Sequence, residues 1–489
     1  MKNETKKYLW IAVAGTIVQF ILFKLLYPFP DFSASSHDYI YAASSGLNIS
    51  IEPIGYSKFL AAFHYITYSD TALVGFQYFF IELAAFYFFY TFRSLYHPAR
   101  NTTNILFIFL FFNPLFLYLG NYISNDPLFF GMSLLWFTQL LWVIYSPMLS
   151  QLLTHSILLF LCITLSHNSY YYFIISAIAF SLSSQRLPLK IIGISLPILL
   201  ILPFVFFTRN AALKITGEKQ YALSTGWQLA NNALYMFEYT DSVRFATAEL
   251  REIDNLTRNF YNSAPRNVYE QLGSYPGNYF VQDSLSPLNT YVRQRYKNDG
   301  DSGRLLAFSK ASSLFRKYGS YQISHNPAAY FWEYILPNSW HYLLPHLEIL
   351  RIYNQGQEKI DLLIQNWFHY KTDKLNVAST QLQGILVSIF PVLFFIINIF
   401  LSVSGVWLLA KKEFKRSSMK FKNSTVLTFS LWIINLLGSI ISGAIVLRHQ
   451  LLPLIIFLSF SLLLVDFIDE KRMQEQHKNI RRSKLSFDK

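Results

Sequence analysis

The chain has little cysteine and little charge. Of its 489 residues, one is cysteine and 14% are charged, whereas about a quarter of the residues in an ordinary soluble domain are charged. The lone Cys162 excludes an internal disulfide framework and a zinc site built on paired cysteines. The sequence also contains no P-loop and no GxGxxG pattern. Nucleotide-dependent chemistry therefore has no support in the sequence.

Apolar residues are abundant and lie in long runs. They make up 53% of the chain, and many runs approach the ~20 helical residues that cross a bilayer. We therefore expect an all-α polytopic membrane protein with about ten or more transmembrane helices. The runs that we predict to be membrane helices are Tyr8–Tyr27, Ala72–Phe92, Ile105–Tyr118, Pro127–Tyr145, Leu152–Leu165, Tyr170–Leu182, Ile191–Phe207, Ile385–Leu409, Val426–Leu447 and Leu451–Phe467.

The distribution of these runs predicts four regions. Residues 1–208 form an N-terminal transmembrane module with a first external loop at 28–70, and residues 209–381 form a soluble domain that is mainly helical. Residues 382–468 form the C-terminal transmembrane helices, and 469–489 form a basic tail. The first apolar run exceeds the ~7–15 residues of a signal peptide core and has no small-x-small cleavage site after it, so we interpret it as a retained helix.

Lysine and arginine set the expected orientation, because they concentrate in cytoplasmic loops. Short apolar runs on both sides of "SHNS" at 166–169 then form a hairpin of two short helices or a re-entrant pair, since a single crossing there would export the later basic run. The net charge of +13 follows from this topology and from contact with anionic lipids; we expect no nucleic-acid partner. The groups predicted to be cytoplasmic are Lys2, Lys6 and Lys7; Arg93 and Arg100; Arg186 and Lys190; Lys411, Lys412, Lys415, Arg416, Lys420 and Lys422; and the tail from Lys471 to Lys489.

Three ionisable residues are expected at helix ends on the outer face: Asp38, Asp126 and Arg448, with His37, His167 and His449 beside them on that face. Ionisable groups at membrane depth are costly and usually functional. Each also has a plain structural interpretation. Asp38 can cap a helix, Asp126 can begin one before Pro127, and Arg448 can extend its guanidinium to lipid head groups.

Three segments carry a resemblance to a known family. "HDYIYAA", "EPIGYSKFLAAFH" and "NPLFLYLGNYISNDPLFFGMSLLWF", following a lone helix, resemble the N-terminal half of GT-C glycosyltransferases. The likeness is greatest to the branch that holds protein O-mannosyltransferases and the transferase that adds aminoarabinose to lipid A. It covers roughly residues 1–210. The resemblance implies transfer of a sugar from a polyprenyl-phosphate carrier to an acceptor on the outer side of the membrane.

The matching positions are few and short. Asp38 and Tyr41 match an acidic residue and a tyrosine, Pro53, Gly55 and Tyr56 match a "PGYP"-like segment, Asp126 matches a later acidic residue, and "RHQLLP" from Arg448 to Pro453 is similar to a late arginine and proline motif. The sequence departs from the family where His37–Asp38 replaces an Asp–Glu pair and where "PIGYS" lacks the second proline.

The chemistry that we expect follows from these residue types. Burial raises the pKa of a carboxyl group, which suits Asp38 as the base that takes a proton from the acceptor. Arg448 suits phosphate oxygens, with His449 as a second donor, and His37 tunes the charge of Asp38. Asp126 orients the acceptor, binds sugar hydroxyls or, with Asp38, helps to hold a divalent cation such as Mg²⁺ or Mn²⁺. We assign Tyr41, Tyr56 and His167 to substrate binding.

The expected partners are the polyprenyl-phosphate sugar, an acceptor that is a protein, lipid or glycan, and membrane lipids. The expected location is a bacterial inner membrane, with an inverting reaction on the outward face. Two alternatives stay open. One is a transporter or flippase of a lipid-linked or anionic substrate. The other is a polysaccharide polymerase or ligase whose key cations lie in the large domain: Arg244, Arg266, Arg293, Arg295 and Arg304.

Overall fold

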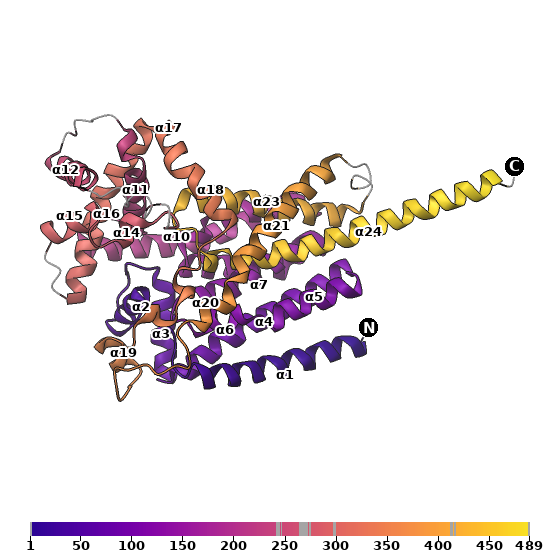
Figure 1. Ribbon diagram of the computed structural model, residues 1–489, viewed down its shortest axis with the longest axis horizontal. Helices are drawn as coiled ribbons and strands as arrows, with labels where there is room; N and C mark the ends of the chain where they lie inside the picture. The colour runs from indigo at the N-terminus through magenta and orange to yellow at the C-terminus, as the bar shows by residue number, and fades with distance from the viewer. Residues whose placement is uncertain are drawn as a thin grey trace.

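The fold is all-helical. The computed structural model describes residues 2–240, 245, 247–263, 272, 275–296, 300–410, 414 and 417–487, and over these residues it contains helices and three isolated β-bridges but no strand (Figure 1). The helices of the membrane region are α1 (Lys2–Leu26), α4 (Asp70–Tyr96), α5 (Arg100–Phe111), α6 (Pro114–Asn121), α7 (Asp126–Tyr145), α8 (Leu149–Leu165), α9 (Tyr172–Leu182), α10 (Leu187–Thr216), α20 (Leu382–Val387), α21 (Ile389–Ala410), α23 (Met419–Ser442) and α24 (Leu451–Phe487).

The remaining elements are shorter on average and more polar. They are α2 (Ala34–Ser44), α3 (Ile54–Ile66), α11 (Ser224–Tyr235), α12 (Ala248–Ser263), α14 (Tyr279–Gln282), α15 (Pro287–Arg295), α16 (Gly300–His325), α17 (Pro327–Tyr330), α18 (Leu336–Leu343) and α19 (Leu362–Trp367), with 3-10 turns η1 (His167–Tyr171), η2 (Phe237–Tyr239), η4 (Glu348–Arg351), η5 (Tyr353–Gly356) and η6 (Leu447–Gln450) and a π-helical turn η3 (Phe331–Ile335).

Apolar helices confirm the prediction of a multi-pass membrane protein. In the part of the chain that the structure describes, eight stretches are long and apolar enough to span a bilayer. All ten predicted runs lie largely on helices. The two runs around "SHNS" give the short helices α8 and α9, of 17 and 11 residues. The membrane region therefore combines eight candidate spans with one shorter helical pair.

The α8–α9 pair forms the predicted hairpin. At its turn, the side-chain amide of Asn125 donates to the Leu165 carbonyl over 2.6 Å. At the far end of α9, Asn423 at the start of α23 donates to the Leu182 carbonyl over 2.8 Å. His155 Nε2 of α8 also lies 2.9 Å from Ser176 Oγ of α9, so the two helices run antiparallel and the chain returns toward its starting side before α10 begins.

The two ends of the helix bundle differ in what they carry. The N-terminus, the α4–α5 turn and the end of α24 lie at one end, whereas α2, α3, α19 and the helices α11–α16 lie at the other (Figure 1). The first end holds Arg93, Arg100 and Lys420. Lys411, Lys412, Lys415 and Arg416 lie outside the described residues. Arg93, Arg100 and Lys420 thus lie at the end of the bundle opposite α2, α3 and α19, as the distribution of basic residues in the sequence predicted. The orientation of the protein in a particular membrane stays a prediction.

The residues between the two membrane modules do not share one hydrophobic core. Some belong to a core of their own, and others belong to the main core of the bundle. Helices α11, α12, α14, α15 and α16 pack around Trp227, Phe280 and Phe315 in a core of their own. The chain beyond α17 returns to the bundle, because Tyr342, Tyr353 and other buried side chains up to Val387 belong to the main core. Residues expected to form one soluble domain are therefore shared between a helical lobe and the bundle.

Candidate active site

The start of α2 is fastened to the loop that precedes α7. The Asp31 amide donates to the Asn121 carbonyl over 2.9 Å, and the Ile123 amide donates to the Asp31 carbonyl over 3.1 Å. Ser36 Oγ, at the first turn of α2, also donates to the Ile123 carbonyl. Because of these bonds, the N-terminal ends of α2 and α7 lie side by side, although about 90 residues separate them in the sequence.

Asp31 supports this junction with its side chain. Its carboxylate accepts hydrogen bonds from the Asn354 amide over 2.9 Å and from Gln383 Nε2 over 3.2 Å. The side chain is buried, and this burial raises the pKa of Asp31 to about 7. It therefore joins the external loop to the chain segments that lead back to the bundle.

Asp38 lies on α2 in a nearly buried position. It is 8% exposed, and Arg304 Nη2 of α16 donates to its Oδ2 over 3.0 Å. Burial raises the pKa of Asp38 to about 6, with Arg304 opposing this rise. At neutral pH the group is thus mainly a carboxylate, and its pKa is close enough to 7 for it to take up a proton.

His37 fixes two other segments to α2. Its Nδ1 lies 2.6 Å from Asp361 Oδ2, and its Nε2 lies 3.0 Å from Asp301 Oδ1. The hydrogen bond with Asp361 does most to raise the pKa of His37, to about 9. The resulting imidazolium also favours the charged form of Asp38, while a role for His37 in tuning a catalytic group stays a prediction.

A second cluster of charged residues is centred on Arg448. Its Nη1 donates to Asp126 Oδ2 over 2.8 Å and its Nε donates to Glu348 Oε2 over 3.0 Å. Asp126 is 4% exposed and also accepts from Ser124 Oγ. One buried carboxylate and one partly buried carboxylate therefore hold one guanidinium, an arrangement that needs the partners to be kept in place by the fold.

The backbone provides that support. The His346 amide donates to the Ile445 carbonyl, and the Leu447 amide donates to the His346 carbonyl over 2.8 Å. This bridge holds the residues that precede η4 beside the start of η6. Glu348 is the first residue of η4 and Arg448 lies on η6, so the bridge brings the two side chains together. His449 lies on the same turn and interacts electrostatically with Asp126.

Glu52 connects the two charged groups. It is half-buried just before α3, and Ser35 Oγ donates to its Oε1 over 2.9 Å. Burial raises the pKa of Glu52. Its carboxylate interacts electrostatically with Asp38 and Arg304, and also with Asp126 and Arg448. Glu52 is thus within electrostatic range of Asp38, Asp126 and Arg448, which the sequence predicted to lie on one side of the membrane.

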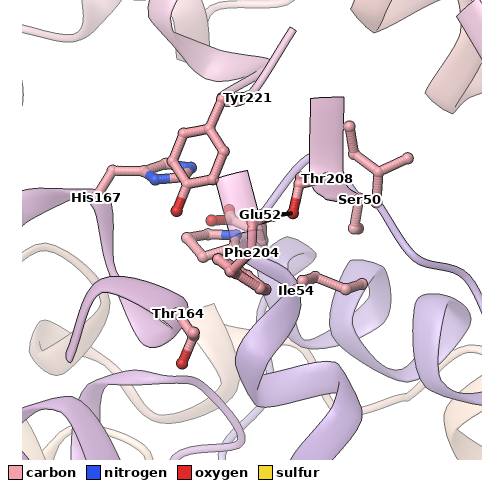
Figure 2. A pocket seen from close by; sticks show the side chains of 10 residues that line it. Ser50, Glu52, Ile54, Thr164, His167, Phe204, Thr208 and Tyr221 are labelled. Atoms are coloured by element: carbon pink, nitrogen blue, oxygen red, sulfur yellow. Dashed lines mark hydrogen bonds between the residues drawn. The ribbon is translucent and has the colours of Figure 1, made fainter. Parts of the chain in front are cut away.

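A small cavity of about 10 Å³ opens beside Glu52. Figure 2 shows Glu52 between His167 and Tyr221 on one side and Ser50 and Thr208 on the other. Burial lowers the pKa of His167 to about 4, so the imidazole is neutral at pH 7. His167, expected from its place at the "SHNS" turn, therefore lies at the same site as a neutral donor or acceptor.

The two predicted tyrosines have different surroundings. Tyr41 is half-buried on α2. Tyr56 is fully buried on α3 and donates to Gln77 Oε1 over 2.6 Å. Gly55, next to it, allows α3 to approach α8, since a Cβ there would lie 2.4 Å from the Thr164 carbonyl oxygen. This segment determines the distance between helices as well as the position of Glu52.

The arginines named for the polymerase alternative are scattered. Arg304 lies at the site, whereas Arg293 and Arg295 are exposed, and Arg293 donates to the Ser284 carbonyl and to Thr290. Arg244 and Arg266 lie outside the described residues.

Several site residues were missed by sequence reasoning. Glu52 had a signal, because it directly precedes the "PIGY" segment in an external loop rich in acidic residues: Asp31, Asp38, Glu52 and Asp70. Asp301, Glu348 and Asp361 had none, since no recognisable motif marks their positions. They come to the site through contacts that span 100 to 324 residues of sequence.

The divalent cation expected at Asp38 and Asp126 stays a prediction. Within the described ranges, no group of three or more His, Cys, Asp or Glu side chains is arranged to hold a metal ion. Asp38 and Asp126 are each paired with an arginine, and a positively charged neighbour does not suit a divalent cation.

Comparisons with protein-family models, with curated proteins and with solved structures give no match to this chain. The functional assignment therefore rests on the geometry of the site.

Proposed function

We propose that this protein is a glycosyltransferase that moves a sugar from a polyprenyl-phosphate carrier to an acceptor on the extracytoplasmic face of the membrane. One observation supports it most. A buried carboxylate with a raised pKa, Asp38, lies on α2, at the end of the bundle opposite the termini (Figure 1), and Glu52 interacts electrostatically with it and with Asp126 and Arg448. A base and a phosphate-binding cation at the membrane surface are the groups that this transfer needs.

Asp38 is the proposed base. It takes the proton of an acceptor hydroxyl or amine as the acceptor atom attacks the anomeric carbon of the sugar. The bond between that carbon and the phosphate oxygen breaks, and its electron pair leaves with the polyprenyl phosphate. The proton stays on the Asp38 carboxyl group, so charge and atoms balance. The single displacement inverts the anomeric centre, as the family resemblance implies.

Arg448 is the proposed ligand of the phosphate. A guanidinium has five N–H donors, and the contacts with Asp126 and Glu348 use the Nε and Nη1 atoms. The Nη2 atom is then left for a phosphate oxygen. The two carboxylates hold the guanidinium in one orientation, which reduces the entropy lost when the phosphate binds.

The neighbouring residues suit the sugar and acceptor. Glu52 and Asp126 offer carboxylate oxygens for hydroxyl groups, and His167 offers a neutral imidazole at the cavity of Figure 2. His449 is a second donor near the phosphate, and Tyr41 lies on the same helix as the base. Tyr56 acts through the position of α3, because its hydroxyl is bound to Gln77.

The test is a donor-consumption assay with purified protein in lipid nanodiscs and a panel of polyprenyl-phosphate monosaccharides. Asp38→Asn should reduce turnover by about 10²-fold or more, and Arg448→Ala should reduce both donor binding and turnover. Asp373→Asn is a matched control, since Asp373 pairs with Lys359 over 2.9 Å on the surface. Thermal melts verify that each variant is folded. Full turnover in Asp38→Asn, or a panel in which no donor is consumed, would contradict the proposal.

One contact favours a second candidate, a polysaccharide ligase or polymerase that uses the same kind of donor. Arg304 of the helical lobe reaches Asp38, so the lobe contributes to the site. Turnover only with a polysaccharide acceptor would favour this candidate. Binding of a donor that crosses the membrane without being consumed would favour the transporter alternative.

A further inference from the structure

The helical turns η3 and α18, which lead from the lobe back to the bundle (Figure 1), expose large apolar side chains. Four of them stand at every fourth position and are between 39% and 67% exposed: Trp332, Leu336, Trp340 and Leu344. A spacing of four residues places side chains along one side of a helix. We call these four residues the apolar stripe.

The opposite side of the same turns is buried and more polar. Tyr334, Asn338 and Tyr342 lie there, each at most 3% exposed. They are offset from the apolar stripe by two residues, which is slightly more than half a turn of helix. Tyr334 Oη donates to the Gly277 carbonyl of the lobe over 3.4 Å. Because a surface helix in water normally turns its polar side outward, this arrangement is the reverse of the one that water favours.

Tyr342 fixes the end of α18 between two membrane helices. Its ring meets Phe394 of α21 edge to face, with the ring centroids 5.6 Å apart. Its hydroxyl accepts a hydrogen bond from Asn435 Nδ2 of α23 over 3.0 Å. Asn435 precedes Ser442, the last residue of α23, by seven residues, which is about 10 Å along a helix. The end of α18 therefore lies within the length of a candidate membrane span.

The surfaces on both sides of this end are apolar. Val392 and Ile396 of α21, and Leu437 and Ile441 of α23, are each at least half exposed. Both helices belong to candidate membrane spans, so their exposed apolar sides face lipid. Since Tyr342 packs between these helices, the opposite side of α18 continues their apolar surface.

The residue types of the apolar stripe suit a lipid environment. Tryptophan is enriched where a membrane meets water, and leucine favours the hydrocarbon. Between Pro327 and Leu347 the chain has no lysine or arginine, and Glu333 is its one acidic residue. Attraction to anionic head groups therefore does not drive the contact, which depends on the apolar area buried.

We propose that η3 and α18 are embedded in the lipid leaflet at the end of the bundle that carries α2 and α3. The partner of the apolar stripe is the bilayer itself. Leu344 lies deepest and Trp332 lies closest to water, because the chain runs from the lobe into the bundle (Figure 1). This inference does not rest on the proposed transfer reaction, since it uses no residue of the site around Asp38 and Arg448.

Spin labels on single cysteines measure this depth. Leu336→Cys, Trp340→Cys and Leu344→Cys are each made in a Cys162→Ala background, labelled, and placed in nanodiscs that hold one chain. Thermal melts verify that each variant is folded. Collisions with oxygen, which concentrates in lipid, should exceed collisions with a water-soluble nickel chelate for the labels at positions 340 and 344. The ratio of the two should decrease from position 344 to position 336.

Two exposed positions provide the reference ratios. Val392→Cys on α21 reports lipid, and Gln294→Cys on α15 of the lobe reports water. Ratios for Trp340→Cys and Leu344→Cys that equal the ratio for Gln294→Cys would overturn the proposal. Low collision rates with both probes would also overturn it, because they would show that protein covers the apolar stripe.

Leu344→Asp tests the same contact without a label. A carboxylate held in lipid is costly, so this variant should lower the melting temperature in nanodiscs by several degrees. Leu285→Asp is the matched control, since Leu285 is 71% exposed on the lobe and a substitution that faces water changes stability little. Equal melting temperatures of Leu344→Asp and wild type would show that the apolar stripe faces water.

Discussion

Single residues at the site act through their unequal surroundings. Asp38 and Asp126 are both buried carboxylates beside an arginine, but Arg304 is partly exposed, with 44% of its side chain accessible, while Arg448 is 18% accessible. The weaker pairing of Asp38 leaves desolvation dominant and its pKa raised to about 6. Asp126 is therefore suited to holding Arg448, and Asp38 to taking a proton.

The pH profile of transfer provides a test of this assignment. A base is active when deprotonated, so kcat/KM should rise with pH through about 6, the pKa of Asp38. Arg304→Gln removes the cation that lowers this pKa and should shift the midpoint upward by about one pH unit. Arg293→Gln, an exposed arginine, is the control. A midpoint that stays fixed or moves down in Arg304→Gln would contradict the role of Asp38.

His37 gives a pH-dependent contribution to stability. Its pKa is raised from 6.5 to about 9 by Asp361 and Asp301, so its ion pairs are fully stabilising below pH 6.5 and are lost as the pH rises through 9. The difference in melting temperature between wild type and His37→Asn should therefore be largest near pH 6 and should vanish above pH 9. Melts from pH 6 to pH 10 measure it. A difference that grows with pH would show that His37 is not the charged link.

The site residues that the sequence predicted are those that border an apolar run. Asp38, Asp126 and Arg448 were predictable because each follows or begins an apolar run, and the parity of the crossings brings them to one end. Glu348 and Asp361 were not, since their positions depend on tertiary contacts such as the His346–Val446 bridge, and Arg304 was named only among the cations of the polymerase alternative. Hydrophobic periodicity carries no information about such contacts.

At the scale of helices, the packing of α3 against α8 sets the position of Glu52. Gly55 permits the approach, because a Cβ at this position would lie 2.4 Å from Thr164 O and 2.9 Å from Thr164 Oγ1. The carbonyl belongs to the helix backbone and cannot rotate away. The two helices must therefore separate if residue 55 acquires a side chain.

Gly55→Ala should lower the free energy of unfolding by about 1–3 kcal/mol and should weaken donor turnover through displacement of Glu52. Gly438→Ala in α23 is the matched control, since its Cβ would meet the Tyr171 ring at an ordinary 3.5 Å. Thermal melts and the donor assay measure both variants. Equal stability of Gly55→Ala and wild type would mean that α3 and α8 adjust without cost.

Helices were predictable from sequence to the extent that they were apolar. The runs that form α4, α7 and α23 are long and bounded by polar residues. For such runs, contact with lipid and packing in the core both favour a membrane-spanning helix. The segment after α17 was assigned to the soluble domain because its composition is mixed. Its buried tyrosines, Tyr342 and Tyr353, pack into the bundle, and a composition average cannot separate such residues from exposed ones.

For the whole molecule, the proposed function requires that the site faces outward. The basic N-terminus and the α4–α5 turn lie opposite α2, α3 and α19 (Figure 1), and the positive-inside rule then assigns the end with Asp38 to the extracytoplasmic side. A polyprenyl-linked sugar and its acceptor would meet there. An inward site would instead face the cytoplasm, and the transfer as proposed would be excluded.

Accessibility of two matched asparagines decides between these orientations. Asn366 on α19 is exposed at the site end, and Asn101 on α5 is exposed at the opposite end. In a Cys162→Ala background, Asn366→Cys should react with a membrane-impermeant maleimide on intact cells, and Asn101→Cys should react only after the membrane is permeabilised. The reverse pattern would place Asp38 and Arg448 inside the cell. Since buried Cys162 is the one native thiol of the chain, removing it leaves the introduced cysteine as the reporter of orientation.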